Sequence, residues 1–105
     1  MTDSKLALIA KSMERQVART GLHAYKRLPA GLEIVMQRQE GGRWRLAMAR
    51  ETPAQPSETE IEVVCGAFGV PSEARLQRLT KWSKHPKSQR DIKYQVVELT
   101  WTERT

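Results

Sequence analysis

The sequence is poor in cysteine and histidine, since it holds one cysteine, Cys65, and two histidines, His23 and His85. A single cysteine excludes an internal disulfide and a metal site built from cysteines alone. The two histidines and the cysteine lie far apart along the chain, so their spacing is not that of metal ligands. We therefore expect no metal and no cofactor, and we interpret Cys65 as a small buried hydrophobic residue.

Long apolar segments are also missing. The apolar run near the N-terminus, residues 6–10, has only five residues, whereas a signal peptide needs roughly 7–15 and a membrane-spanning helix about 20. We therefore expect a soluble, cytoplasmic protein with no membrane partner. A chain of 105 residues, with 39% hydrophobic and 29% charged residues, has the size and composition of one globular domain, which we assign to residues 1–105.

The net charge of +6 is distributed unevenly along the chain. Residues 51–73 contain five glutamates and no basic residue, whereas residues 74–90 contain six basic residues and no acid. An acidic segment followed directly by a basic one predicts two surfaces of opposite sign. The basic surface suits a polyanion such as DNA or RNA.

The first half of the chain predicts a helix followed by a β-hairpin. Apolar residues recur at helical spacing over residues 4–20, and Gly21 is suited to end that helix. Residues 22–30 are predicted as a connection. In residues 31–50 apolar and polar residues alternate on both sides of Gly41 and Gly42, which supply the positive φ angles of a tight turn. One face of this hairpin is therefore apolar and should pack against the first helix.

The middle of the chain predicts a linker and a second helix. Residues 51–57 contain two prolines, which are unfavourable in a regular element. Ser57 and Glu60 then form the Ser-x-x-Glu pattern of a capping box. Because apolar residues follow at helical spacing, we predict a helix over residues 58–68.

The last third is less clear. Residues 74–83 fit either a short helix or a strand, and we favour the strand because residues 84–91 then form an ordinary hairpin loop. Residues 92–102 are rich in β-branched and aromatic residues and predict a strand. Its apolar side changes near Val96-Val97, which predicts a bulge there. The predicted fold is a two-layer α+β sandwich, with an antiparallel sheet of three or four strands and two helices on one face, in the order α-β-β-α-β-β.

The basic segment 75–90 is the main candidate for a binding site. Phosphate binding requires cations that nearby acids do not neutralise, and an exposed aromatic ring can stack on unpaired bases. The segment would be only a solvated surface if its tryptophan were buried or if residues 51–73 paired with its cations. The predicted nucleic-acid-binding residues are Arg75, Arg78, Lys81, Trp82, Lys84, His85, Lys87 and Arg90, together with Arg43 and Arg45 from the hairpin.

A helix-turn-helix is a second interpretation of part of the same region. Residues 64–79 resemble the first helix, glycine turn and recognition helix of that motif. In this alignment Arg75, Gln77 and Arg78 would contact DNA bases. However, Arg75 and Arg78 fall on positions where the motif requires apolar residues, so the match is weak.

Two further functions stay open. A protein-interaction subunit or a homodimer could pair the acidic and basic segments reciprocally. A small basic ribonuclease-like enzyme would need a base and a phosphate-binding cation. The residues available for it are His23, His85, Glu33, Tyr94 and Arg45, although nothing in their spacing requires a common site.

Residues 32–50 with their Gly-Gly turn, followed by Pro56-Ser-Glu and by Ala67-Phe-Gly-Val-Pro71, resemble a set of small bacterial proteins without an assigned function. The resemblance covers about a third of the chain. It implies a compact α+β domain and supplies no functional residues.

Overall fold

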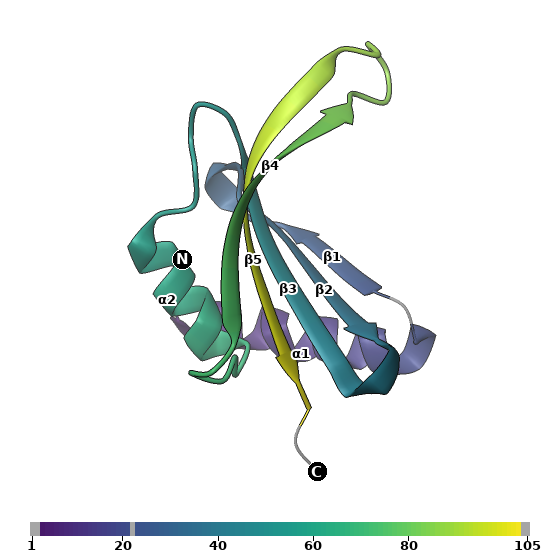
Figure 1. The fold of residues 1–105 in the computed structure, drawn as a ribbon, viewed down its shortest axis with the longest axis vertical. Helices are drawn as coiled ribbons and strands as arrows, with labels where there is room; N and C mark the ends of the chain where they lie inside the picture. The colour runs from purple at the N-terminus through teal and green to yellow at the C-terminus, as the bar shows by residue number, and fades with distance from the viewer. Residues whose placement is uncertain (1–2, 22, 104–105) are drawn as a thin grey trace.

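Two helices lie on one face of a five-stranded antiparallel sheet in the computed structural model, which describes residues 3–21 and 23–103 (Figure 1). The strand order across the sheet is β1-β2-β3-β5-β4. We call the sheet face opposite the helices the open face. The elements are α1 (Asp3–Thr20), β1 (His23–Arg27), β2 (Glu33–Gln39), β3 (Arg43–Glu51), α2 (Glu58–Ala67), β4 (Arg75–Lys84) and β5 (Asp91–Thr102).

The predicted first helix and hairpin are confirmed. The amide of Gly21 donates to the carbonyl of Val17 over 2.8 Å, and Gly21 has the positive φ of +69° that favours glycine at a helix end. The turn between β2 and β3 is a short 3-10 segment, Glu40–Gly42. The residues buried between α1 and this hairpin are Leu6, Ala10, Met13 and Val17 on the helix, and Ile34, Met36, Leu46 and Met48 on the strands.

The prediction of three or four strands is wrong, because residues within the predicted connection form a fifth strand, β1. It pairs with β2 over its whole length, from His23 opposite Gln37 to Arg27 opposite Glu33. The order of elements is therefore α-β-β-β-α-β-β. β1 is an edge strand in which only Ala24 is buried, so it lacks the apolar alternation by which a strand is recognised in a sequence.

The predicted capping box at the start of α2 is confirmed. The hydroxyl of Ser57 accepts from the amide of Glu60 over 3.1 Å, and the carboxylate of Glu60 accepts from the amide of Ser57 over 2.9 Å. The same carboxylate forms a bidentate pair with Arg50 of β3, with distances of 2.6 and 2.7 Å. One glutamate therefore fixes both the helix end and its attachment to the sheet. Helix α2 buries Ile61 and Val64 in the core, and its C-cap residue Phe68 is buried there as well.

The predicted strand over 74–83 is confirmed as β4, and the predicted bulge in β5 is wrong. β5 pairs residue for residue with β3 on one side and with β4 on the other, without an interruption at Val96 or Val97. Val97 belongs to the core under the helices, whereas Val96 lies on the open face between Ala49 and Leu79. The apolar pattern changes side because β5 is buried on both of its faces.

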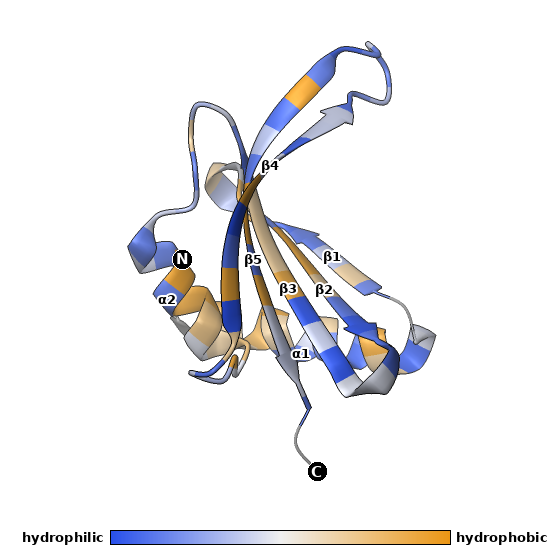
Figure 2. Cartoon of the chain, in the orientation of Figure 1, coloured by the Kyte–Doolittle hydropathy of each residue, from blue (hydrophilic) through white to orange (hydrophobic). Residues whose placement is uncertain are grey.

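Hydrophobic residues lie along the helices and in the centre of the sheet, and hydrophilic residues predominate along β4 and at the end of the β4–β5 hairpin (Figure 2). None of the helices in residues 3–21 and 23–103 combines the length and the apolar character needed to cross a membrane.

Candidate nucleic-acid interface

The β4–β5 hairpin extends past the rest of the sheet. β3 pairs with β5 only as far as Tyr94, whereas β4 continues to pair with β5 as far as Lys84 opposite Asp91. Residues 82–93 therefore form a two-stranded ribbon with a six-residue loop, which we call the arm. It projects from one end of the molecule (Figure 1). The arm has four Lys or Arg residues and one acid, which gives it a net charge of +3 with His85 neutral.

Hydrogen bonds within the loop hold the tip of the arm in a defined shape. The amide of His85 donates to the carbonyl of Arg90 over 2.8 Å, and the amide of Gln89 donates to the carbonyl of His85 over 3.0 Å. The Nδ1 atom of His85 accepts from the amides of Lys87 and Ser88, each over 3.2 Å. This geometry requires Nδ1 to be unprotonated. His85 therefore organises the loop that presents the exposed side chains of Lys87 and Arg90.

Trp82 is the large aromatic residue of the arm, and 66% of its surface is exposed. It lies opposite Lys93 in the strand pairing, and the ammonium of Lys93 sits 5.7 Å from the centre of the indole ring. This cation–π contact holds a positive charge beside an exposed aromatic surface. The other two tryptophans, Trp44 and Trp101, stack on each other 6.5 Å apart and pack against the core.

The cations of β4 do not form one continuous surface. Arg75, Arg78, Lys81 and Lys84 recur every third residue, and successive side chains of a strand point to opposite faces. Arg75 and Lys81 therefore lie on the open face, whereas Arg78 and Lys84 lie on the face that carries the helices.

Two of these cations are neutralised within the chain. Arg78 pairs with Glu58 in the first turn of α2, and Lys84 pairs with Asp91 across the arm over 3.0 Å. Among the described residues, the exposed cations Lys81, Lys87, Arg90 and Lys93 form no ion pair. At the arm and its base, these four are the charges left for a polyanion.

The structure separates the arginines of the β2–β3 hairpin from the arm. Arg45 forms an ion pair with Glu98 over 2.8 Å, and both side chains are largely buried. Arg43 and Arg75 lie on the open face near Thr100 and Thr102, at the end of the sheet away from the arm. The predicted site residues are therefore split into the arm and a smaller basic patch at the opposite end.

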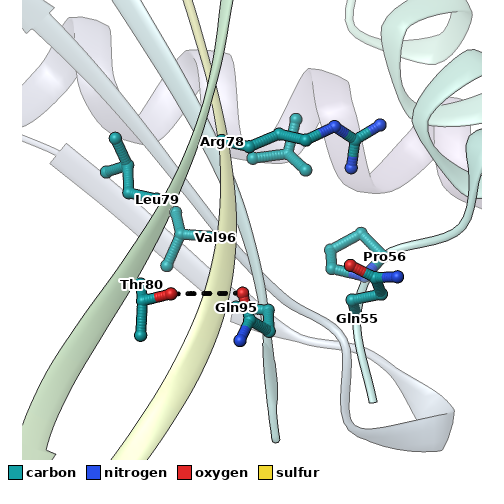
Figure 3. A pocket seen from close by; sticks show the side chains of 8 residues that line it. Gln55, Pro56, Arg78, Leu79, Thr80, Gln95 and Val96 are labelled. Atoms are coloured by element: carbon teal, nitrogen blue, oxygen red, sulfur yellow. Dashed lines mark hydrogen bonds between the residues drawn. The ribbon is translucent and has the colours of Figure 1, made fainter. Parts of the chain in front are cut away.

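A small cleft of about 170 Å³ lies at the base of the arm, between β4, β5 and the linker before α2 (Figure 3). In it Thr80 donates to the side-chain oxygen of Gln95 over 3.3 Å. The side chain of Arg78 points towards the α2 side of the cleft (Figure 3). It donates there to the carboxylate of Glu58. This contact, together with the Arg50 pair, connects the acidic segment to the sheet within one chain.

The residues of the nuclease hypothesis do not form one site, although burial raises the pKa of Tyr94 and the nearby charge of Glu33 raises it further. His23 lies opposite Gln37, which is four residues from Glu33 along β2. At 3.3 Å per residue, the backbones of His23 and Glu33 are separated by about 13 Å along the strand direction. Glu33 instead accepts from the hydroxyl of Tyr25, and this hydrogen bond raises the pKa of Tyr25 to about 12. Tyr94 lies opposite Glu51 near the arm, His85 is in the arm loop, and Arg45 is held by Glu98 at the other end of the sheet.

The helix-turn-helix interpretation is wrong, because the segment that would be its recognition helix is the strand β4. The sequence prediction also missed Lys93, since it lies beyond the basic segment, two residues after Asp91. Its position opposite Trp82 could be found only from the register of the hairpin.

The chain matches no protein-family model, no curated protein and no solved structure.

Proposed function

We propose that this protein is a non-catalytic module that binds nucleic acid through the arm. The observation that carries the proposal is a projecting ribbon in which an exposed tryptophan lies beside Lys93, with three more cations without acidic partners in the loop and at the base of the ribbon. Unpaired like charges repel one another and favour a polyanionic ligand, and the exposed indole offers a surface on which a sugar or base can pack. Lys81, Lys87, Arg90 and Lys93 contact the polyanion, and Trp82 packs against a sugar or base.

The proposal predicts a strong dependence of affinity on salt. The logarithm of the association constant for a duplex falls with the logarithm of salt concentration. The slope is about −3.6 if all four cations neutralise a phosphate, and about −1.8 if only Lys81 and Lys93 do so. Fluorescence anisotropy with labelled 20-nucleotide oligonucleotides, measured between 25 and 200 mM salt, gives this slope. Absence of binding to DNA and RNA at the lowest salt would refute the proposal.

A matched pair of triple variants locates the site. Changing Lys81, Lys87 and Arg90 to Gln removes three charges from the arm region, and the slope should fall to about −0.9. Changing Lys5, Lys11 and Arg15 to Gln removes three charges from the exposed side of α1, and the slope should stay near the wild-type value. Equal effects of the two variants would mean that binding follows net charge and not the arm.

The homodimer hypothesis has less support, because Glu58 and Glu60 of the acidic segment already pair with Arg78 and Arg50 of the same chain. Light scattering tests it: a dimer that dissociates as salt is raised, in a protein that binds no oligonucleotide, would favour the protein-interaction function.

A further inference from the structure

The four unpaired cations of the arm and its base lie on both faces of the β4–β5 hairpin and at its tip. Lys81, at the base of the arm, points to the open face, whereas Lys93 and Trp82 point to the opposite face. Lys87 and Arg90 lie in the loop that joins the two strands. A ligand that binds all four cations must therefore surround the ribbon.

A single strand of nucleic acid does not meet this requirement. A single-stranded chain follows one groove or one face of a protein and stacks its bases on several aromatic rings. On the arm Trp82 is the only tryptophan, tyrosine or phenylalanine, and Lys93 already occupies a position over its ring. The other aromatic ring, that of His85, is engaged by two amides of the loop. A groove of a duplex, in contrast, has a row of phosphates on each side and base edges at its floor.

The dimensions of the arm select one kind of groove. The major groove of B-form DNA is about 12 Å wide and about 8.5 Å deep and admits a two-stranded β-ribbon, whereas the minor groove is only about 6 Å wide. The major groove of an RNA duplex is deep and too narrow to be read by side chains. The amide of Thr52, the residue after β3, donates to the carbonyl of Lys93 over 2.9 Å. Beyond this contact two residue pairs, Ser83 opposite Ile92 and Lys84 opposite Asp91, add about 7 Å of strand before the six-residue loop. The tip can therefore reach the floor of a B-DNA major groove before the body of the protein meets the phosphates.

We infer that the arm enters the major groove of double-stranded DNA tip first, an inference that rests on the proposed function. Lys81 and Lys93 contact the two phosphate rows that border the groove. Lys87 and Arg90 reach base edges, where cationic side chains favour guanine O6 and N7. His85 is a positioning residue, because its Nδ1 fixes the loop that carries these two side chains.

The first test compares three ligands of one sequence at one salt concentration: a DNA duplex, its single strand and the corresponding RNA duplex. We expect the DNA duplex to bind at least about tenfold more tightly than either of the others. Equal or tighter binding of the single strand or of the RNA duplex would overturn the inference and leave the proposed function standing. Absence of binding to all three would refute the proposed function itself.

The second test asks whether both faces of the arm contact phosphate. Lys81→Gln and Lys93→Gln should each reduce the steepness of the salt dependence by about 0.9, and the double variant by about 1.8. Lys11→Gln on the exposed side of α1 is the matched control and should leave the slope unchanged. Lys93→Arg keeps the charge beside Trp82 and should bind like the wild type, which separates loss of a phosphate contact from a distorted arm. An effect of only one of the two glutamine variants would overturn insertion between two phosphate rows.

The third test identifies the groove. Dimethyl sulfate methylates guanine N7 in the major groove and adenine N3 in the minor groove. The bound protein should protect guanine N7, and Lys87→Gln with Arg90→Gln should abolish that protection. Protection of adenine N3 without protection of guanine N7 would overturn the assignment to the major groove.

Discussion

The ion pair between Arg50 and Glu60 should be a measurable source of stability, and Glu60→Gln isolates it. Glutamine keeps a side-chain oxygen that can accept from the amide of Ser57, so the capping box is preserved while the bidentate pair with Arg50 loses its charge. The hydrogen bonds from Arg50 lower the pKa of Glu60 from 4.5 to about 2. At about 1.36 kcal/mol per pKa unit, this difference corresponds to roughly 3.4 kcal/mol.

Solvent reduces this value, because 32% of the Glu60 side chain is exposed, and we expect a loss of about 2 kcal/mol for Glu60→Gln at pH 7. The pKa of Glu60 is lower in the folded chain, so the unfolded chain binds more protons as the pH falls. The pair therefore stabilises the fold fully at pH values above 4.5, the pKa of Glu60 in the unfolded chain. This stabilisation is lost as the pH falls towards 2. The difference between wild type and variant should shrink to less than about 1 kcal/mol at pH 3.

Urea unfolding at pH 7 and pH 3, followed by the fluorescence of the stacked pair Trp44 and Trp101, measures both values. Glu62→Gln is the matched control, since it makes the same change in charge on the exposed side of the same helix and should cost less than about 0.5 kcal/mol. The reasoning fails if Glu60→Gln costs the same at both pH values, or if it costs no more than the control at pH 7.

Three further predictions concern single positions. Trp82→Ala should lower the free energy of unfolding by less than about 1 kcal/mol, because the side chain is 66% exposed. The same change should weaken DNA binding several-fold in the anisotropy assay. An unchanged affinity would show that Trp82 is not part of the site. Leu46→Ala should lower the free energy of unfolding, measured in urea, by about 2–5 kcal/mol, since Leu46 of β3 is fully buried in the core under the helices. A loss below about 1 kcal/mol would contradict this packing. Burial raises the pKa of the Cys65 thiol, so its alkylation by iodoacetamide at pH 7.5 should be several-fold slower in the native protein than in urea; equal rates would show that the thiol is accessible.

The elements that the sequence predicts well are those whose pattern is set by their own residues. The apolar stripe of α1, the alternation in β2 and β3 and the capping box of α2 each identify an element without reference to the rest of the chain. β1 could not be predicted in this way, because it is held by its pairing with β2 and buries only Ala24. The bulge in β5 was wrong for a related reason, since burial of Val96 on the open face depends on Ala49 and Leu79 in its neighbours.

The candidate site was only partly predictable. The sequence identifies the basic segment, but a spacing of three residues in a strand sends successive cations to opposite faces. Which cations stay unpaired depends on contacts between distant segments: Glu58 reaches Arg78 across 20 residues, and Glu98 reaches Arg45 across 53. The partner of Trp82 is likewise fixed by strand register, which composition and spacing do not determine.

The position of β4 at the edge of the sheet gives part of its charge an explanation that needs no ligand. An edge strand with charged side chains on both faces resists pairing with a second sheet, and this accounts for Arg75, Arg78 and Lys81. It does not account for Lys93, which lies on the neighbouring strand β5, or for Lys87 and Arg90 in the loop. Nor does it account for Trp82, because an exposed aromatic residue on a free edge promotes the association that the charges oppose. The tip of the arm and the pair of Trp82 with Lys93 are therefore the features that favour a nucleic-acid ligand.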